Sequence, residues 1–272
     1  MINKAILVLC IVLTGFVVFW GQHSWSKQQE SIHTHTATPV SNKESEDKAA
    51  DEPKSVNTNP ADSETLSNLI SNQPENVQKM WLEHQQNDRP VDITFVASGF
   101  ALLSEENWTT LLEDEMTAVY EDEDLQLNFT VVEWEGNSVD WLTSIKNSST
   151  DFAEADLVVY EIPTIYDNGE VEPEDQQINM EEFISFLLEN YPDTHLFVQP
   201  SQPLYNAAIY PEHVAGVRLI AEQLNIPYLD HWTDWPDSDD PELENYLTED
   251  SDPNELGNST WGTYLSNYFT GN

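Results

Sequence analysis

From residue 74 onward, hydrophobic and polar positions alternate between two patterns. Short apolar runs, or stretches in which every second residue is apolar, are typical of strands, whereas apolar residues three and four positions apart are typical of helices. The strand pattern occurs at 91–97, 125–134, 156–162, 195–198 and 226–229. The helix pattern occurs at 74–86, 108–120, 139–145, 180–190, 211–224 and 261–269. This alternation predicts a parallel sheet with helices on both faces, an α/β/α sandwich whose ligands bind beyond the carboxyl ends of the strands.

An apolar segment precedes this alternation. Residues 5–20 are apolar except for Thr14 and Gly15, and at about 1.5 Å per residue they span ~24 Å, slightly less than a ~30 Å hydrocarbon core. Such a segment is either a cleaved signal peptide or a short membrane anchor. Because no small-x-small cleavage site follows, we favour an uncleaved anchor at residues 1–21. Lys4 then lies on the cytoplasmic side of the cell membrane, and the single-pass chain has its bulk outside the cell.

Residues 22–75 separate this segment from the alternating pattern. They are rich in Ser, Thr, Asn, Lys and Glu and contain few large apolar side chains. A segment of this composition cannot bury enough apolar surface to fold, so we expect a disordered, acidic and polar linker. Residues 76–272 are long enough for one domain. The single cysteine, Cys10, lies in the apolar segment, which excludes an intramolecular disulfide and a cysteine-based zinc site.

The charge of the domain limits its partners. Residues 76–272 contain four Lys and Arg residues against forty-one Asp and Glu residues, a formal charge of −37. Such a surface repels itself in dilute buffer, and salt relieves the repulsion because the Debye length falls to about 3 Å at 1 M. We therefore expect a halophilic or alkaliphilic setting. Nucleic acid is excluded as a partner, because phosphate binding needs a basic patch.

Several segments at the ends of the predicted strands carry candidate chemistry. They read ITFVAS at 93–98, YDNG at 166–169, QPSQPLY at 199–205, YLDHW at 228–232 and DPNELG at 252–257. Over residues 91–271 the chain resembles the SGNH/GDSL hydrolases, in particular a membrane-anchored subgroup from Gram-positive bacilli. The resemblance implies a flavodoxin-like α/β/α sandwich with a five-stranded parallel sheet, and a serine esterase that needs neither a cofactor nor a metal.

In that family a serine after the first strand attacks a carbonyl carbon, and its amide, a glycine and an asparagine stabilise the oxyanion. The resemblance implies Gly136 and Asn168 as the oxyanion residues. The Gly-Asp-Ser motif aligns most simply with residues 97–99, which places Gly99 at the position of the nucleophile. A shift by one residue places Ser98 there, and Ser98 is our candidate nucleophile.

A free serine hydroxyl needs a base within hydrogen-bond reach. The family has a histidine before the last helix, and Asp252 stands at that position here. An aspartate with an ordinary pKa near 3.9 is a weak base at neutral pH. His231, which follows the predicted fifth strand, is therefore a second candidate base.

Each candidate also has a purely structural interpretation. Ser98 could cap a turn, His231 could be a packed loop histidine whose nitrogens bond to the backbone, and Asp252 could cap a turn or helix ahead of Pro253. The acidic run 237–244 lacks the glycine at the sixth position of an EF-hand loop. We interpret it as a solvated loop and predict no metal site.

Two functional hypotheses follow. The first is a membrane-tethered, extracytoplasmic ester hydrolase acting on acyl or acetyl esters of small molecules or glycans. The second is a catalytically inactive SGNH-fold protein that binds an envelope glycan or a partner protein. The missing histidine favours the second, as do six tryptophans that could stack on sugars. These are Trp108, Trp134, Trp141, Trp232, Trp235 and Trp261.

Overall fold

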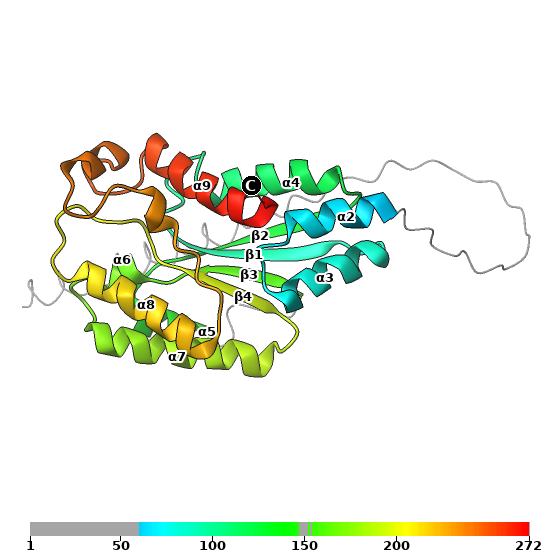
Figure 1. Ribbon diagram of the computed structural model, residues 1–272. Helices are drawn as coiled ribbons and strands as arrows, with labels where there is room; N and C mark the ends of the chain where they lie inside the picture. The colour runs from blue at the N-terminus through cyan, green and yellow to red at the C-terminus, as the bar shows by residue number, and fades with distance from the viewer. Residues whose placement is uncertain (1–59, 147–151, 153, 272) are drawn as a thin grey trace, which may run out of the picture. The chain divides into compact units, whose positions relative to one another are not determined.

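The computed structural model describes residues 60–146, 152 and 154–271 (Figure 1). Helices α2 (Pro60–Leu69) and α3 (Glu75–Gln86) come first. The following elements are β1 (Val91–Ser98), α4 (Trp108–Glu121), β2 (Leu127–Trp134), α5 (Ser138–Lys146), β3 (Leu157–Glu161), α6 (Thr164–Asp167), α7 (Pro173–Asn190), β4 (His195–Gln199), α8 (Tyr210–Leu224) and α9 (Glu255–Thr270). Two 3-10 helices, η1 (His231–Asp234) and η2 (Pro241–Tyr246), lie between α8 and α9.

The described strands form one parallel sheet in the order β2-β1-β3-β4. The central strands β1 and β3 are covered on both faces, and all but one of their residues are buried. A parallel strand buried on both faces reads as a continuous apolar run, which is the pattern of their sequences. The prediction of an α/β sandwich with a parallel sheet is therefore confirmed.

The predicted fifth strand needs a correction. Residues 226–229 contribute a single parallel bridge, between Tyr228 and Val198, and no strand. Pro227 has no N–H to donate, and the N–H of Ile226 donates to Ala221 O at 2.8 Å in the turn that ends α8. Two of the four residues therefore cannot donate to a ladder. The sheet of the described residues has four strands, and β4 is an edge strand.

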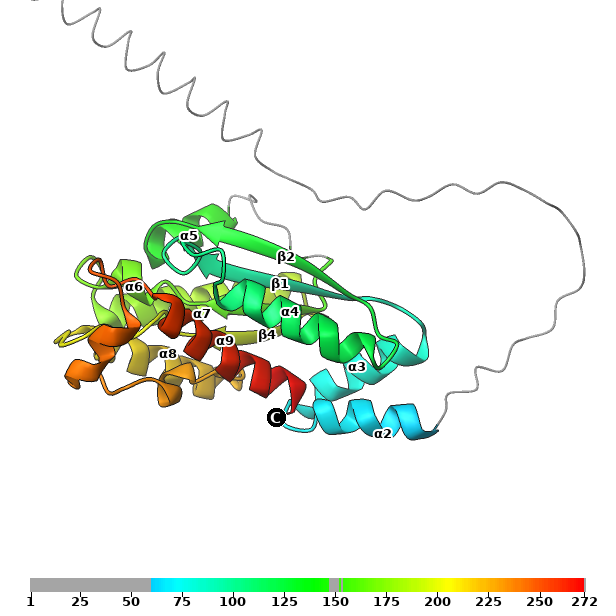
Figure 2. The ribbon, with the colours of Figure 1, turned by 90° about the horizontal axis from the view of Figure 1, so that it is seen from above.

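Helices cover the sheet in two layers. Helices α2, α3, α4 and α9 pack on one face, and α5, α7 and α8 on the other (Figures 1 and 2). Successive strand residues point to opposite faces, so Phe95 and Ala97 enter the first core while Val96 enters the second. Trp108 of α4 stacks on Trp261 of α9 with ring centroids 5.7 Å apart, which joins the two long helices of the first layer.

Polar residues set the ends of the main helices. Asn107 caps α4 through a capping box, in which its side chain accepts from Thr109 N and Thr110 N. Asn254 caps α9 in the same way, by accepting from the N–H groups of the first turn. Asn225 ends α8 in the left-handed conformation, with φ 55°.

The linker predicted over residues 22–75 is wrong at its C-terminal end. Residues 60–69 form α2, and Leu66 and Ile70 are fully buried in the first core. The loop after α2 then binds the end of α9, because Asn72 Nδ2 donates to Tyr268 O at 2.7 Å. Sparse apolar residues are sufficient here because Leu66 and Ile70 are buried in the first core, where α2 packs beside α3.

The predicted anchor and the linker up to residue 59 lie outside the described residues. Within the described part of the chain, no helix is both long and apolar enough to span a bilayer.

Candidate functional site

The carboxyl edge of the sheet brings polar residues from separate strands together. Ser98, the last residue of β1, lies opposite Trp134 of β2, and Glu161, the last residue of β3, lies opposite Gln199 of β4. Ser98, Glu161 and Gln199 are fully buried. Ligand sites of open parallel sheets lie just beyond this edge, so we expect the candidate site beyond these buried residues.

Ser98 is bound to a carboxyl group. Its Oγ–H donates to Glu161 Oε1 at 2.7 Å, and its backbone N–H donates to Glu161 Oε2 at 3.1 Å. Its Oγ also accepts from Ala101 N at 3.2 Å. With the hydroxyl engaged on both sides and the side chain inaccessible, Ser98 joins β1 to β3 and is not presented to a ligand.

The buried Glu161 is the centre of this network. Burial raises the pKa of its carboxyl group, and the hydrogen bonds from Ser98 oppose that rise. A buried carboxyl group is tolerated only when its oxygens have hydrogen-bond donors. Through its two bonds to Ser98, Glu161 of β3 is tied to the end of β1.

The structure does not bring His231 to Ser98. His231 is fully buried and stacks on Trp261 with ring centroids 4.3 Å apart. Its Nδ1 accepts from Trp235 Nε1 at 3.1 Å, and because an indole can only donate, the ring proton lies on Nε2 and is donated to Pro200 O at 3.0 Å. Burial lowers the pKa of His231 to about 3. Both nitrogens are occupied, so His231 is a neutral, packed loop histidine that cannot accept the proton of Ser98.

Asp252 lies just before α9, at the place where the resemblance expects a histidine. Its backbone is held by Thr248, through Asp252 N to Thr248 Oγ1 at 3.1 Å and Thr248 N to Asp252 O at 2.8 Å. Burial, followed by the negative charge of Asp250, raises the pKa of its carboxyl group. The hydroxyl of Ser98 binds Glu161, so the structure does not form a Ser98–Asp252 pair.

An open depression of about 480 Å³ lies beyond the ends of β1 and β2. Its apolar and aromatic lining comes from Phe100, Leu103 and Tyr166, and its charges from Glu133 and Glu135. The rings of Phe100 and Tyr166 lie 4.8 Å apart. A concave surface that combines aromatic rings with a few polar groups is typical of small-ligand sites.

Gly99 lines this depression and contributes no side chain to it. A Cβ built on Gly99 would lie 3.2 Å from Glu133 Oε1 and 3.5 Å from Tyr166 Oη. A side chain at position 99 would thus point among the lining residues, whereas the side chain of Ser98 points into the protein. With Gly99 at the position of the nucleophile, as the simplest alignment has it, no side chain projects into the depression at that position.

The two predicted oxyanion residues are placed differently. Gly136 lines the same depression and has φ +103°, a conformation that favours glycine. Asn168 is the C-cap of α6, where its N–H donates to Thr164 O at 3.1 Å, and it is not among the lining residues. Of the predicted oxyanion pair, only Gly136 faces the depression.

The electrostatics of the depression are negative. Burial, followed by the charges of Glu135, Glu161 and Glu133, raises the pKa of Tyr166 to about 12. The phenol therefore stays protonated at neutral pH and can donate a hydrogen bond to a ligand. With carboxylates as its only charged groups, the depression favours neutral or cationic ligands.

Asp167 and the acidic loop have structural partners. Asp167 is fully buried, and its Oδ1 accepts from Ser138 N at 2.8 Å, which ties α6 to the start of α5. In the loop after η1, Asp240 caps η2 by accepting from Glu242 N at 2.9 Å. Among residues 60–146 and 154–271, no group of three His, Cys, Asp or Glu side chains could hold a metal ion.

The six tryptophans do not form a sugar platform. Trp232 is half-buried, and the other five are buried: Trp108, Trp134, Trp141, Trp235 and Trp261. They build the two cores and the packing around His231, so the second hypothesis cannot rest on them.

Sequence reasoning missed Glu161, Tyr166 and the pair Glu133 and Glu135. One signal was present for Glu161, because it is an acidic residue inside the otherwise apolar run 157–162. A carboxyl group at the end of a buried strand requires a partner. The other three residues lie at the end of β2 and in α6, and they meet only in the folded chain, so no local pattern indicates their proximity.

Comparisons with known proteins concern the fold. No protein-family model matches the chain, and no curated protein matches it. Solved structures match over about two thirds of the chain and nearly their own full length. A GDSL-like lipase from Parabacteroides merdae has 9% identity, TM-score 0.53, and coverage of 66% of this chain and 95% of its own. An acetylxylan esterase from Geobacillus stearothermophilus has 14% identity, TM-score 0.51, and coverage of 66% and 94%.

A third structure, the psychrotrophic esterase EstA from Pseudoalteromonas sp., has 16% identity and TM-score 0.50, and the match covers 65% of this chain and 95% of that one. At these identities the likeness concerns the arrangement of strands and helices. Together with the sheet order and the position of the depression, it identifies the architecture. The chain has the fold of the SGNH/GDSL hydrolases.

Proposed function

We propose that this protein is a membrane-tethered, extracytoplasmic SGNH-fold protein that binds an ester-bearing small molecule or glycan at its carboxyl-edge depression without hydrolysing it. One observation carries the proposal. The side chain that would point into the depression is absent at Gly99, and the neighbouring Ser98 donates its hydroxyl to the buried Glu161. Ligand binding remains available to a fold that has lost the nucleophile.

The absence of a histidine base beside Ser98 supports the same conclusion. Nucleophilic catalysis needs a base within about 3.2 Å of the hydroxyl. His231 has both nitrogens occupied, and Asp252 replaces the histidine before α9. Removal of a single member of such a machinery already costs several powers of ten in rate.

Ester hydrolysis is the second candidate, and the Ser98–Glu161 hydrogen bond favours it. A carboxylate 2.7 Å from a serine hydroxyl, with its pKa raised by burial, has the geometry of a base. Hydrolysis by this pair would require Ser98 to become exposed, since the side chain is inaccessible in the structure. In this second candidate, Ser98 would attack an acyl or acetyl ester with Glu161 as its base.

Location at the membrane rests on the apolar segment at residues 5–20 and on Lys4 before it. The acidic domain would lie outside the cell, where its charge disfavours nucleic acid and other anionic partners.

Activity and binding are tested separately. Full-length protein is assayed with a short-chain aryl ester between about 0 and 3 M KCl, a range that spans full screening, at neutral and alkaline pH beside Ser98→Ala. We expect no hydrolysis by either protein. Hydrolysis that disappears in a folded Ser98→Ala variant would establish the second candidate instead.

Binding is measured by calorimetry with an acetylated xylooligosaccharide. Gly99→Leu should abolish it by filling the depression, whereas Gly99→Ala should retain it, because the added Cβ meets the end of the flexible Glu133 side chain. Equal binding by Gly99→Leu and the wild type would contradict the proposed site.

A further inference from the structure

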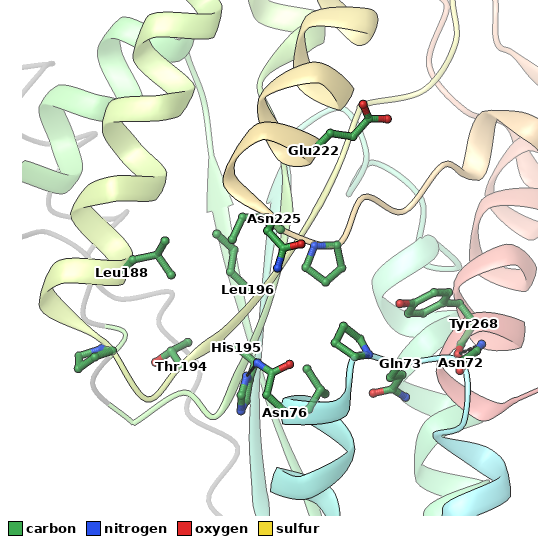
Figure 3. Close-up of a pocket in the computed structure, with 15 residues that line it drawn as sticks. Asn72, Gln73, Asn76, Leu188, Thr194, His195, Leu196, Glu222, Asn225 and Tyr268 are labelled. Carbon is green, nitrogen blue, oxygen red and sulfur yellow. Dashed lines mark hydrogen bonds between the residues drawn. The ribbon is translucent and has the colours of Figure 1, made fainter.

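A second, larger pocket lies at the opposite end of the sheet. Its volume is about 710 Å³, and it is bounded by the start of β4, the loop before α3 and the C-terminal ends of α7, α8 and α9 (Figure 3). The parallel strands place their amino ends here and their carboxyl ends at the depression. The pocket therefore has no part in the site already described.

The chemistry of this pocket differs from that of the rest of the surface. The domain carries forty-one acidic residues, yet Glu222 is the only carboxylate among the fifteen lining residues, and none of them is Lys or Arg. The polar lining is mainly amide, from Asn72, Gln73, Asn76 and Asn225. Amides donate and accept hydrogen bonds at once, as sugar hydroxyls do. A lining without cations offers nothing to phosphate or carboxylate ligands.

Two of these amides, Asn72 and Asn76, retain unused carbonyl oxygens. Asn72 uses its Nδ2 on Tyr268 O, and Asn76 uses its Nδ2 on His195 Nδ1 at 3.1 Å, which leaves their carbonyl oxygens for a ligand. Asn225 is exposed at the end of α8, next to the pocket centre (Figure 3). Tyr268 presents its half-buried ring beside these amides, as a sugar-binding wall requires.

The edge of β4 adds main-chain groups but too few for a peptide strand. Val198 N donates outward to Pro227 O at 3.0 Å, and His195 N donates inward to Asp156 O at 2.9 Å. By alternation the N–H of Leu196 faces outward, where no strand of the described chain lies beside it. The outward N–H of Leu196 can donate to a ligand hydroxyl. The addition of a peptide strand would need several free main-chain groups along the edge.

We propose that this amide-lined pocket is a binding site for a neutral glycan, held by hydrogen bonds of its hydroxyls with the side chains of Asn72, Asn76 and Asn225 and by contact with Tyr268. The site is independent of the carboxyl-edge depression and does not rest on the function proposed for it. It would allow the protein to hold a glycan chain at one end of the sheet while the depression remains open.

The test is calorimetric titration of the full-length protein with cellotetraose and with chitotetraose, neither of which carries an ester. We expect at least one to bind, and Asn225→Gly to weaken binding about tenfold by removing an amide. Glycine accepts the positive φ of this position, so the helix end is preserved. Asn206→Gly is the matched control, because Asn206 is also exposed with φ 53° but lies outside the pocket.

Glu222→Gln separates a neutral ligand from a cationic one and should leave the affinity within about twofold, since the amide keeps an acceptor. Absence of binding to both tetrasaccharides would overturn the proposal. Unchanged binding by Asn225→Gly would also overturn it and would indicate main-chain pairing at β4. Loss of binding in Glu222→Gln would overturn it as well and would indicate a cation site. Gly99→Leu should leave the affinity unchanged, which keeps this test distinct from that of the depression.

Discussion

The hydroxyl of Ser98 donates a 2.7 Å hydrogen bond to Oε1 of Glu161, and the backbone N–H of the same serine donates to the other oxygen of that carboxyl group. Two adjacent strands are thus joined at their carboxyl ends by one side chain. The candidate nucleophile Ser98 is therefore a structural contact, and this changes the effects expected from mutations at the site.

Ser98→Ala should lower stability and should not abolish an activity. The substitution leaves a buried carboxyl group without one donor, and the free energy of unfolding should fall by about 1–3 kcal/mol. Urea unfolding of the full-length protein measures this fall. Ser259→Ala, on an exposed position of α9, is the control and should change stability by less than about 0.5 kcal/mol. Equal effects of the two substitutions would contradict the structural role of Ser98.

Glu161→Gln should change how stability depends on pH. Burial raises the pKa of Glu161 above 4.5, so the folded protein keeps the proton of this carboxyl group at a pH at which the unfolded chain has lost it. The resulting stability is fully present below pH 4.5 and is lost as the pH rises through the pKa of the folded state. The free energy of unfolding of Glu161→Gln relative to the wild type should therefore increase as the pH rises above 4.5. A difference that stays constant with pH would refute this role for burial.

His231 should remain neutral far below its ordinary pKa. Burial lowers that pKa from 6.5 to about 3, so its contribution to stability is present above pH 6.5 and is lost as the pH falls towards 3. The loss is roughly 1.4 kcal/mol for each pH unit. Nitrogen NMR of labelled histidine should show the Nε2–H tautomer of His231 still present at about pH 5, between these pKa values. A ring that protonates near pH 6.5 would contradict the buried contacts with Pro200 and Trp235.

Cysteine substitutions should separate positions 98 and 99. In a Cys10→Ala background, which has no other cysteine, Gly99→Cys should react rapidly with a maleimide because its side chain opens into the depression. Ser98→Cys, one residue earlier, should react only as fast as the protein unfolds. Measurement of both rates by mass spectrometry in native buffer tests the alignment directly. Fast labelling of both, or of position 98 alone, would contradict it.

Salt should stabilise the protein. With a formal charge of −37 on residues 76–272, self-repulsion falls as the Debye length shortens from about 10 Å at 0.1 M to about 3 Å at 1 M. The melting temperature should rise over this range of KCl, whereas an uncharged osmolyte at the same osmolality should have a smaller effect. A melting temperature that is insensitive to KCl would contradict the prediction of a salt-adapted surface.

The sequence predicted the order of strands and helices because most elements bury one regular face. The runs at 91–97 and 156–162 are apolar, and both become central strands. The start of α9 was placed six residues late, because the signal there is the cap at Asn254 and not an apolar residue. The strand predicted at 226–229 fails for a similar local reason, the missing N–H of Pro227.

The sequence predicted at which edge of the sheet the site lies, but not which side chains face it. Residue type and the end of β1 placed Ser98 correctly along the chain, but the direction of its side chain depends on whether position 98 or 99 faces inward. That choice is decided by Glu161, which is sixty-three residues away in the sequence. Likewise, the burial and the protonation state of His231 depend on contacts with Trp235 and with Trp261 of α9, which the local sequence around His231 does not indicate.

A clamp between the loop after α2 and the last turn of α9 fixes the end of the domain at which the described chain begins. The last turn of α9 gives its carbonyls to Asn72 and Gln73, so the chain enters the folded part beside its own C-terminal helix, at the amino end of the sheet (Figure 1). A membrane tether pulling at Pro60 would therefore load this clamp and leave the distant strand exits without mechanical strain.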